Sequence, residues 1–214
     1  MPISRAGYGL VGLIVLLFIL VTAIVLSDPS IYDSPLGWVV RLSALYGFLM
    51  TAIAAISTSY LVLVARTFGR PFIRVHHTFA VLGFVLFTVH PFSYAFLVMT
   101  PAVFIPSFRS WIDFWANGGR VALILFYIAV AGSLLHTRWK RWRYAHTLMY
   151  VALLLAIVHA NLIGTDFTNG TILWIYNISF GAVVAAFLLN MRRKWRLRPK
   201  ISVPGSKGSE ADGR

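Results

Sequence analysis

Six long apolar stretches run through this chain of 214 residues and limit its possible folds more than any other feature. A helix needs roughly 20 apolar residues to cross the hydrocarbon core of a bilayer, and the six stretches have lengths close to or above this. The mean hydropathy of the whole chain, +0.79, is too high for a soluble domain with a polar surface. The sequence therefore predicts an all-α integral membrane protein, a six-transmembrane-helix bundle with helices at about 6–26, 38–65, 72–99, 119–136, 144–164 and 171–191.

The placement of the charges gives this bundle a direction. The formal net charge is +13, and of the 19 basic residues only Arg41, Arg109 and Arg120 fall on one side of the predicted membrane. The positive-inside rule puts the other, strongly basic side in the cytoplasm, together with the N and C termini. Anionic lipid headgroups account for the basic charge. We therefore expect the lipid bilayer and no nucleic acid as a partner, in a multi-pass protein of the plasma or inner membrane.

The chain is predicted to form one domain. Residues 1–198 make up the transmembrane bundle, and residues 199–214, rich in Gly, Ser and Lys, form a disordered cytoplasmic tail that is too short to hold a flavin or nicotinamide domain.

The longest connection between helices, about Thr100 to Gly118, carries several aromatic side chains and few charges. We expect it to lie along the outer face of the membrane as an aromatic-rich cap, either as an anchor or as a lid or docking surface over an outer cofactor.

Four histidines lie inside two of the apolar stretches. His76 and His90 are fourteen positions apart in the third stretch, and His146 and His159 are thirteen positions apart in the fifth. Histidine is rare in lipid-spanning segments and is usually functional there. The chain has no cysteine, so imidazole is the remaining strong iron ligand, and haem iron takes two imidazoles from facing helices.

The predicted topology matches the two pairs in depth. The third and fifth helices both run from the cytoplasm to the outside, so His76 and His146 lie near the inner face while His90 and His159 lie nearer the outer face. At a rise of about 1.5 Å per residue, these spacings separate the two levels by roughly 20 Å, which leaves room for two cofactors within one bilayer. We expect two haem b groups per chain, one at each level.

Two further histidines compete for the inner level. A spacing of fourteen makes about 3.9 helical turns, so His76 shares a helix face with His90, whereas His77 is only thirteen positions, about 3.6 turns, from His90. This favours His76, but His77 and His136 both stay open as inner ligands. The same spacing of thirteen turns His146 away from His159 in an ideal helix.

Haem propionates need cationic partners near the membrane faces. On the outer side Arg120 and Arg41 lie near the starts of their helices, and on the inner side Arg143 is the main candidate, with Arg74 and Arg138 as others. These arginines are predicted to bind propionates. The alternative is that they extend along the bilayer toward water, as interfacial arginines commonly do.

Three motifs in the second half of the chain carry a family resemblance: Gly119-Arg120-Val121-Ala122, Trp142-Arg143-Tyr144-Ala145-His146-Thr147-Leu148-Met149-Tyr150, and His159. With them, residues 37–191 resemble the ferric reductase-like transmembrane domain family. Ferric reductases, NADPH oxidases and the haem-binding membrane subunit of the periplasmic methionine sulfoxide reductase system share this domain. The flavin and nicotinamide domain of the oxidases and iron reductases is absent, and in that respect the chain is closer to the last of these.

The resemblance implies a diheme b-type cytochrome subunit, an oxidoreductase component without a catalytic residue of its own. Electrons would pass from a cytoplasmic flavoprotein or a quinol through the haems to an extracytoplasmic acceptor, a protein or a small molecule.

Two other classes of function stay open: a proton or metal-ion transporter that uses the histidines, and a structural or assembly subunit of a larger membrane complex. The third and fifth apolar stretches contain no acidic residue and, apart from Pro91, no internal proline, which disfavours a transporter.

Overall fold

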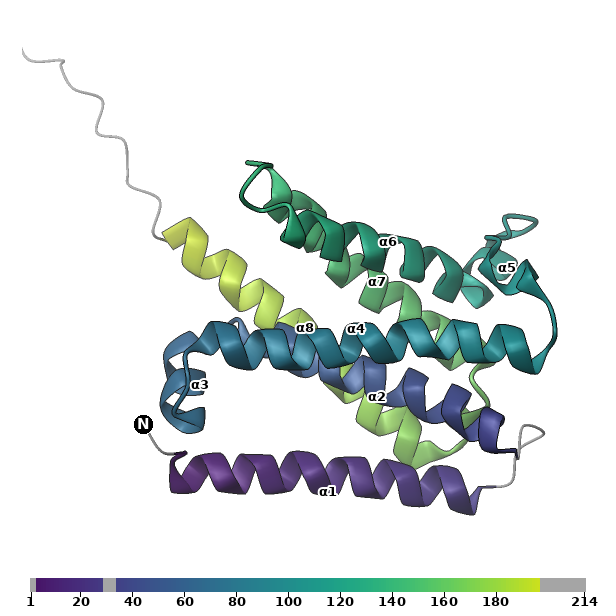
Figure 1. The fold of residues 1–214 in the computed structure, drawn as a ribbon, viewed down its shortest axis with the longest axis horizontal. Coiled ribbons are helices and arrows are strands. Elements are labelled where there is room, and N and C mark those ends of the chain that lie inside the picture. Colours follow the sequence, from purple (N-terminus) through teal and green to yellow (C-terminus); the bar gives the residue numbers. More distant parts are fainter. Residues whose placement is uncertain (1–2, 29–33, 197–214) are drawn as a thin grey trace, which may run out of the picture.

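The computed structural model describes residues 3–28 and 34–196, and within them every regular element is a helix (Figure 1). The α-helices are α1 (Arg5–Ser27), α2 (Pro35–Ser57), α3 (Leu61–Phe68), α4 (Phe72–Leu97), α5 (Trp111–Ala116), α6 (Gly118–Leu134), α7 (Trp142–Ile163) and α8 (Gly170–Arg196). Two short 3₁₀ helices, η1 (Pro101–Phe104) and η2 (Thr165–Thr168), lie in the connections. The predicted disordered tail, 199–214, lies outside the described residues.

Five of the described helices, α1, α2, α4, α7 and α8, are long and apolar enough to cross a membrane. Helix α6 is also apolar but has 17 residues, which corresponds to about 25 Å at about 1.5 Å per residue. These helices are those of a multi-pass α-helical membrane protein, and the prediction of an all-α membrane protein is confirmed for the described residues.

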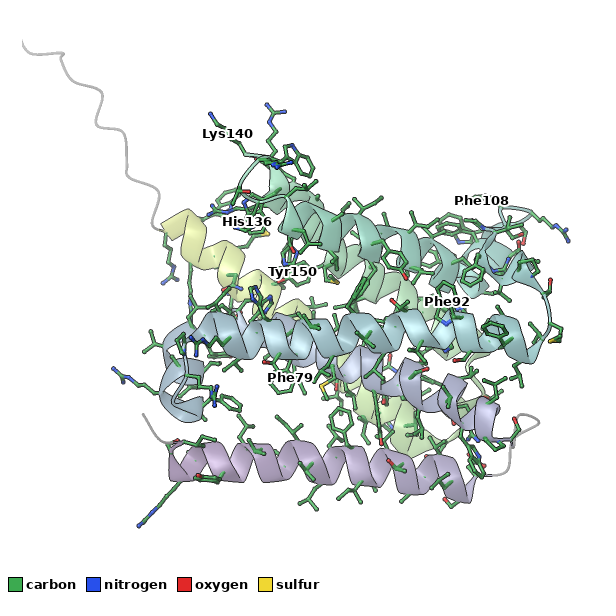
Figure 2. All side chains as sticks on the ribbon, in the orientation of Figure 1. Phe79, Phe92, Phe108, His136, Lys140 and Tyr150 are labelled. Atoms are coloured by element: carbon green, nitrogen blue, oxygen red, sulfur yellow. The ribbon has the colours of Figure 1, made fainter. Side chains whose placement is uncertain are left out.

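The long helices run lengthwise, so the bundle has two distinct ends (Figure 1). The start of α1, helix α3, the α6–α7 connection and the end of α8 lie at one end, which we call the basic end after Arg66, Arg70, Arg138, Lys140, Arg141 and Arg143. Elements η1, α5 and η2 lie at the opposite end, which we call the aromatic end after Phe108, Trp111, Phe114 and Trp115. Figure 2 shows Lys140 and His136 at the basic end and Phe108 at the aromatic end.

Helix α2 is the central helix of the bundle. It packs antiparallel along α4 and also contacts α1 and α8, while α6 packs antiparallel along α7. The pairs α2–α4 and α6–α7 form the two most extensive helix contacts. The main apolar core lies where α1, α2, α7 and α8 meet and includes the buried side chains Val21, Leu49, Leu153, Ile172 and Val183.

The predicted helix 38–65 is wrong at its C-terminal end, because α2 ends at Ser57 and a separate short helix, α3, follows. The hydroxyls of Ser57 and Thr58 each donate to a carbonyl three residues earlier, at 2.7 Å. Arg193 of α8 donates to the carbonyl of Ser59 at 2.6 Å. Hydrogen bonds of this kind compete with the helical ones, so the chain leaves the helix here although its apolar character continues.

Two glycines bring α2 and α4 close together. A Cβ atom on Gly83 would overlap the hydroxyl oxygen of Thr51 and lie 3.1 Å from its backbone nitrogen, and a Cβ on Gly47 would lie 3.1 Å from the backbone nitrogen of Phe87. The α2 and α4 backbones can therefore approach this closely only because neither glycine has a side chain, as is common where membrane helices pack.

We expect Gly83→Ala to lower the thermal stability of the detergent-solubilised protein. The added methyl must push α2 away from α4, and overpacking of this kind costs about 1–3 kcal/mol. Gly181→Ala is the matched control, because a Cβ at Gly181 of α8 meets nothing within 4 Å. This control should leave the unfolding temperature unchanged or raise it, since alanine favours a helix by up to about 1 kcal/mol over glycine. Equal unfolding temperatures for the two variants would contradict the close contact.

Candidate functional site

Both α4 histidines are held by backbone carbonyls of α2. Nδ1 of His76 lies 3.0 Å from the carbonyl oxygen of Ala54, and Nδ1 of His90 lies 2.9 Å from that of Val40. The two carbonyls are fourteen positions apart along α2, from 40 to 54, and the two histidines are equally far apart along α4, from 76 to 90. The rise per residue is the same in the two antiparallel helices, so fourteen residues along α4 cover the same distance as fourteen residues along α2. Each histidine of α4 therefore meets a carbonyl of α2.

The α7 histidines repeat this arrangement on the other helix pair. Nδ1 of His146 lies 3.4 Å from the carbonyl oxygen of Ala129 in α6, and Nδ1 of His159 lies 2.6 Å from that of Ala116 in α5. The carbonyls are thirteen positions apart, from 116 to 129, and so are the histidines, from 146 to 159. All four imidazoles therefore have a carbonyl partner on a neighbouring helix.

These partners decide which ring nitrogen is free for other chemistry. A carbonyl oxygen only accepts hydrogen bonds, so each Nδ1 must carry the proton, and in a neutral imidazole Nε2 then has a lone pair. A carbonyl on one ring nitrogen is a usual arrangement around a histidine that binds a metal through the other nitrogen. The same bonds also satisfy a buried histidine with no ligand, so they allow metal ligation but do not require it.

His76 of α4 and His146 of α7 come together in the half of the bundle nearer the basic end. Their ring centres are 6.5 Å apart, with the rings steeply inclined to each other. In bis-imidazole iron coordination each Nε2 lies about 2 Å from the metal and each ring centre about 1 Å further out, so the two centres are about 6 Å apart. The distance between the two rings thus fits a shared metal atom.

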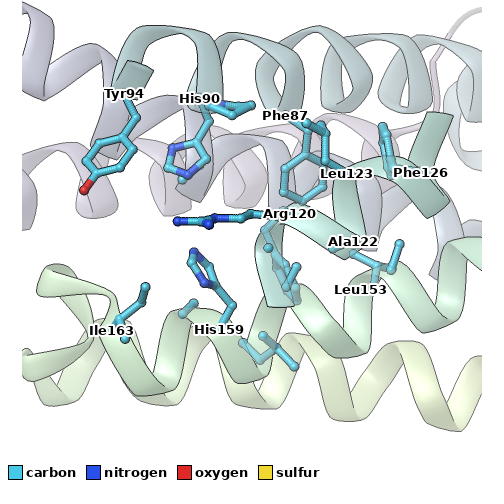
Figure 3. A pocket seen from close by; sticks show the side chains of 18 of the residues that line it. Phe87, His90, Tyr94, Arg120, Ala122, Leu123, Phe126, Leu153, His159 and Ile163 are labelled. Atoms are coloured by element: carbon cyan, nitrogen blue, oxygen red, sulfur yellow. The ribbon is translucent and has the colours of Figure 1, made fainter. Parts of the chain in front are cut away.

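His90 and His159 line one pocket nearer the aromatic end, with about 1160 Å³ of empty space including the part that opens outward. Figure 3 shows their imidazoles on opposite sides of this pocket, with the side chain of Arg120 between them. The remaining lining is mainly apolar and comes from α2, α4, α6, α7 and α8, including Phe48, Phe87, Phe126, Leu153 and Ile163. The pocket thus combines two facing imidazoles and one guanidinium with a mainly apolar wall.

Gly119 leaves room for the ring of His159. A Cβ atom at Gly119 would lie 3.0 Å from Nε2 of that ring. The spacing of thirteen turns His146 and His159 about 140° apart in an ideal helix, and the structure accommodates this because their carbonyl partners lie on different helices, α6 and α5. The two imidazoles of α7 therefore need not share one helix face.

The two alternative inner ligands do not lie between α4 and α7. His77 is exposed, with its ring centre 5.9 Å from that of His76. His136 is exposed in the α6–α7 connection, and its Nδ1 lies 3.0 Å from the carbonyl oxygen of Ser133. The structure thus brings His76, and neither alternative, next to His146.

The predicted propionate arginines have different surroundings. Arg120 lines the pocket of His90 and His159, and its Nη1 donates to the carbonyl of Ile105 at 2.6 Å. Arg143 is exposed at the basic end, and its guanidinium lies over the ring of Trp142, which in turn packs 5.9 Å from the His146 ring. Arg74 and Arg138 are exposed at the basic end.

Arg41 is not among the residues that line this pocket, and it has a carboxylate partner. Its Nε and Nη2 lie 2.9 and 2.6 Å from Oδ1 of Asp166 in η2. The side chains are 4% and 11% exposed, respectively. Arg41 therefore ties the start of α2 to the α7–α8 connection, and this ion pair competes with the predicted propionate contact.

The donor set suits haem better than a bare metal ion. No group of three or more His, Cys, Asp or Glu side chains that could hold an ion is found among the described residues. Each level offers two imidazole nitrogens, and structural zinc sites need four protein ligands. Haem needs only two from the protein because the porphyrin supplies the other four, so the residues present fit haem.

Sequence reasoning missed two kinds of residue at this site. The carbonyl partners Val40, Ala54, Ala116 and Ala129 act through their backbones, so their side chains give no signal. Tyr176 of α8 also lines the pocket, is 1% exposed, and has a hydroxyl without a hydrogen-bond partner among the described residues.

Comparison with protein-family models, with curated proteins and with solved structures gives no match to this chain.

We expect Asp166→Ala to destabilise the protein by about 3 kcal/mol or more, because it leaves the buried guanidinium of Arg41 without this carboxylate. Arg41→Met combined with Asp166→Ala should cost clearly less, since removing both charges avoids an unpaired one. Thermal unfolding of the unaltered chain, the two single variants and the double variant in one detergent measures the difference. A double variant as unstable as the sum of the single variants Arg41→Met and Asp166→Ala would show that the two charges do not interact.

Proposed function

We propose that the chain is a diheme b-type cytochrome subunit that carries electrons across a membrane, similar to ferric reductase-like transmembrane domains. The observation that supports this most is the common arrangement of the four imidazoles: each has Nδ1 on a backbone carbonyl. They lie in two pairs, each with one histidine from α4 and one from α7. Two ligands per level, at two levels, is what two stacked bis-histidine haems require.

The proposed topology has six spans with both termini in the cytoplasm of the plasma or inner membrane. Helix α6 would be the sixth span, since 17 residues is at the lower limit of the usual range of about 17–25. The basic end would face the cytoplasm. His76 and His146 would then hold the inner haem, and His90 and His159 the outer haem.

Each group of residues would have a separate task. When bound, haem b supplies a one-electron iron centre. The four imidazoles would hold the two haems, with His76 and His146 at one level and His90 and His159 at the other. Arg120 is suited to pair with an outer propionate, and the apolar lining of the pocket would exclude water. Arg143 is the corresponding candidate on the inner side.

The chain would depend on partners at both faces. A cytoplasmic flavoprotein or a quinol would give electrons to the inner haem, and an extracytoplasmic protein or small molecule would accept them from the outer one. The transporter alternative gains no support, because each level has two imidazoles and, among the described residues, no carboxylate ligand. No observation favours a purely structural or assembly role.

The proposal is tested first by the absorption spectrum of the purified chain. A reduced-minus-oxidised spectrum of b type, with about two haems per chain by extraction and quantification, is the expected result. A chain that is purified folded, after expression with ample haem, and that shows no Soret absorption would exclude this function.

Single alanine variants test the pairing. We expect His90→Ala and His159→Ala each to lose the outer haem and keep most of the inner one, and His76→Ala and His146→Ala to do the reverse. His77→Ala and His136→Ala are matched controls that should keep both haems, since neither ring lies between α4 and α7. If His77→Ala lost as much haem as His76→Ala, the inner assignment would be wrong.

A further inference from the structure

One of the four histidines is held differently from the others. The carbonyl partners of His76, His90 and His146 belong to the long helices α2 and α6, whereas that of His159 is Ala116, the last residue of the short helix α5. This Nδ1-to-oxygen distance, 2.6 Å, is also the shortest of the four. The orientation of His159 therefore depends on a short helix in the connection between α4 and α6.

A single carboxylate holds this short helix from both sides. The hydroxyl of Ser107, before α5, donates to Oδ2 of Asp113, and the side-chain amide of Asn117, just after α5, donates to Oδ1 at 2.8 Å. The backbone N–H of Asp113 donates to the side chain of Ser110, which caps the start of α5, at 3.1 Å. Asp113 thus joins the chain before α5 to the residue that follows Ala116.

The charge of Asp113 suits this role. The hydrogen bond from Ser107 lowers the pKa of the Asp113 carboxyl below its ordinary value, and the nearby Arg109 and the Asn117 amide act in the same direction. The group is therefore ionised at neutral pH. An ionised carboxylate only accepts hydrogen bonds, so it can bind both donors at once.

We propose that Asp113 is a positioning residue for the outer haem, which acts on His159 through α5 and the carbonyl of Ala116. The inference rests on the proposed function, since it concerns the ligand of a bound haem. A hydrogen bond from Nδ1 to a well-placed acceptor fixes the ring and raises the basicity of Nε2, and this changes both metal affinity and redox potential. Movement of α5 would weaken that bond at the outer haem only.

Aromatic contacts provide the rival explanation of how α5 is held. Phe114 packs 5.9 Å from Phe108 and 5.4 Å from Trp115, measured between ring centres. If these contacts alone fixed α5, loss of the Asp113 carboxylate would leave His159 undisturbed. The two explanations therefore differ in what they predict for a variant at Asp113.

The experiment compares Asp113→Ala and Asp113→Asn with the unaltered full-length chain, purified with both haems. The midpoint potential and the electron paramagnetic resonance spectrum are measured for each haem, and the outer haem is identified as the signal that His90→Ala loses. We expect Asp113→Ala to shift the potential and the resonance of the outer haem and to weaken its binding by about tenfold or more. The inner haem, whose ligand His146 bonds to α6, should be unchanged and serves as an internal control.

Two further variants sharpen the test. Asp113→Asn keeps the shape of the side chain and one acceptor oxygen, so it should shift the outer haem less than Asp113→Ala. Thr100→Ala removes a side chain that accepts from Ala102 at the start of η1. It lies in the same connection but outside the Asp113 network, so it should leave both haems unchanged.

Three results would overturn the inference while leaving the proposed function intact. They are an unchanged outer haem in Asp113→Ala, equal changes in both haems, and an outer-haem shift in Thr100→Ala as large as that in Asp113→Ala. Absence of haem from the unaltered chain would instead overturn the proposed function, and the inference with it.

Discussion

Close contact within two antiparallel helix pairs is the condition on which the remaining arrangement depends. Lipid tails are as apolar as leucine, so membrane helices associate through tight packing and hydrogen bonds rather than through the hydrophobic effect. Gly83 allows this contact between α2 and α4, and Gly132 allows it between α6 and α7, where an added Cβ would lie 2.7 Å from that of Ala145. Only at such a distance can an imidazole on one helix reach a carbonyl on its neighbour.

Helix α2 is fixed at both ends by polar contacts with the last third of the chain. Asp166 pairs with Arg41 near its start, and Arg193 donates to the turn that follows its end. Ending α2 at Ser57 also matters for the site, because the last carbonyls of a helix lack an intrahelical partner. The carbonyl of Ala54 belongs to this last turn, where it accepts from the hydroxyl of Ser57 and from Nδ1 of His76. The same polar turn thus shortens the helix and provides an acceptor for a histidine.

The features of this protein that depend on the type and spacing of side chains can be predicted from its sequence. Long apolar runs predicted the long helices. The spacing of the histidines predicted two pairs, and in the fold His76 lies beside His146 while His90 and His159 line one pocket. The end of α2 was mispredicted because the hydroxyl residues Ser57, Thr58 and Ser59 lie between two apolar runs and were taken as part of one helix, whereas the hydroxyls of Ser57 and Thr58 bond to the backbone there. The carboxylate partner of Arg41 lies far along the chain, at position 166, so no local pattern could indicate it. The carbonyl acceptors were equally out of reach, because any residue type supplies one.

The equal spacing of histidines and carbonyls has a consequence for how the length of this protein can vary over evolution. A residue inserted between His76 and His90 would move one histidine past its acceptor unless α2 gained a residue between Val40 and Ala54 as well. The same reasoning links the stretch from Ala116 to Ala129 with that from His146 to His159. Relatives with the same arrangement should therefore change the lengths of these segments in pairs or not at all, while the connections outside them vary freely.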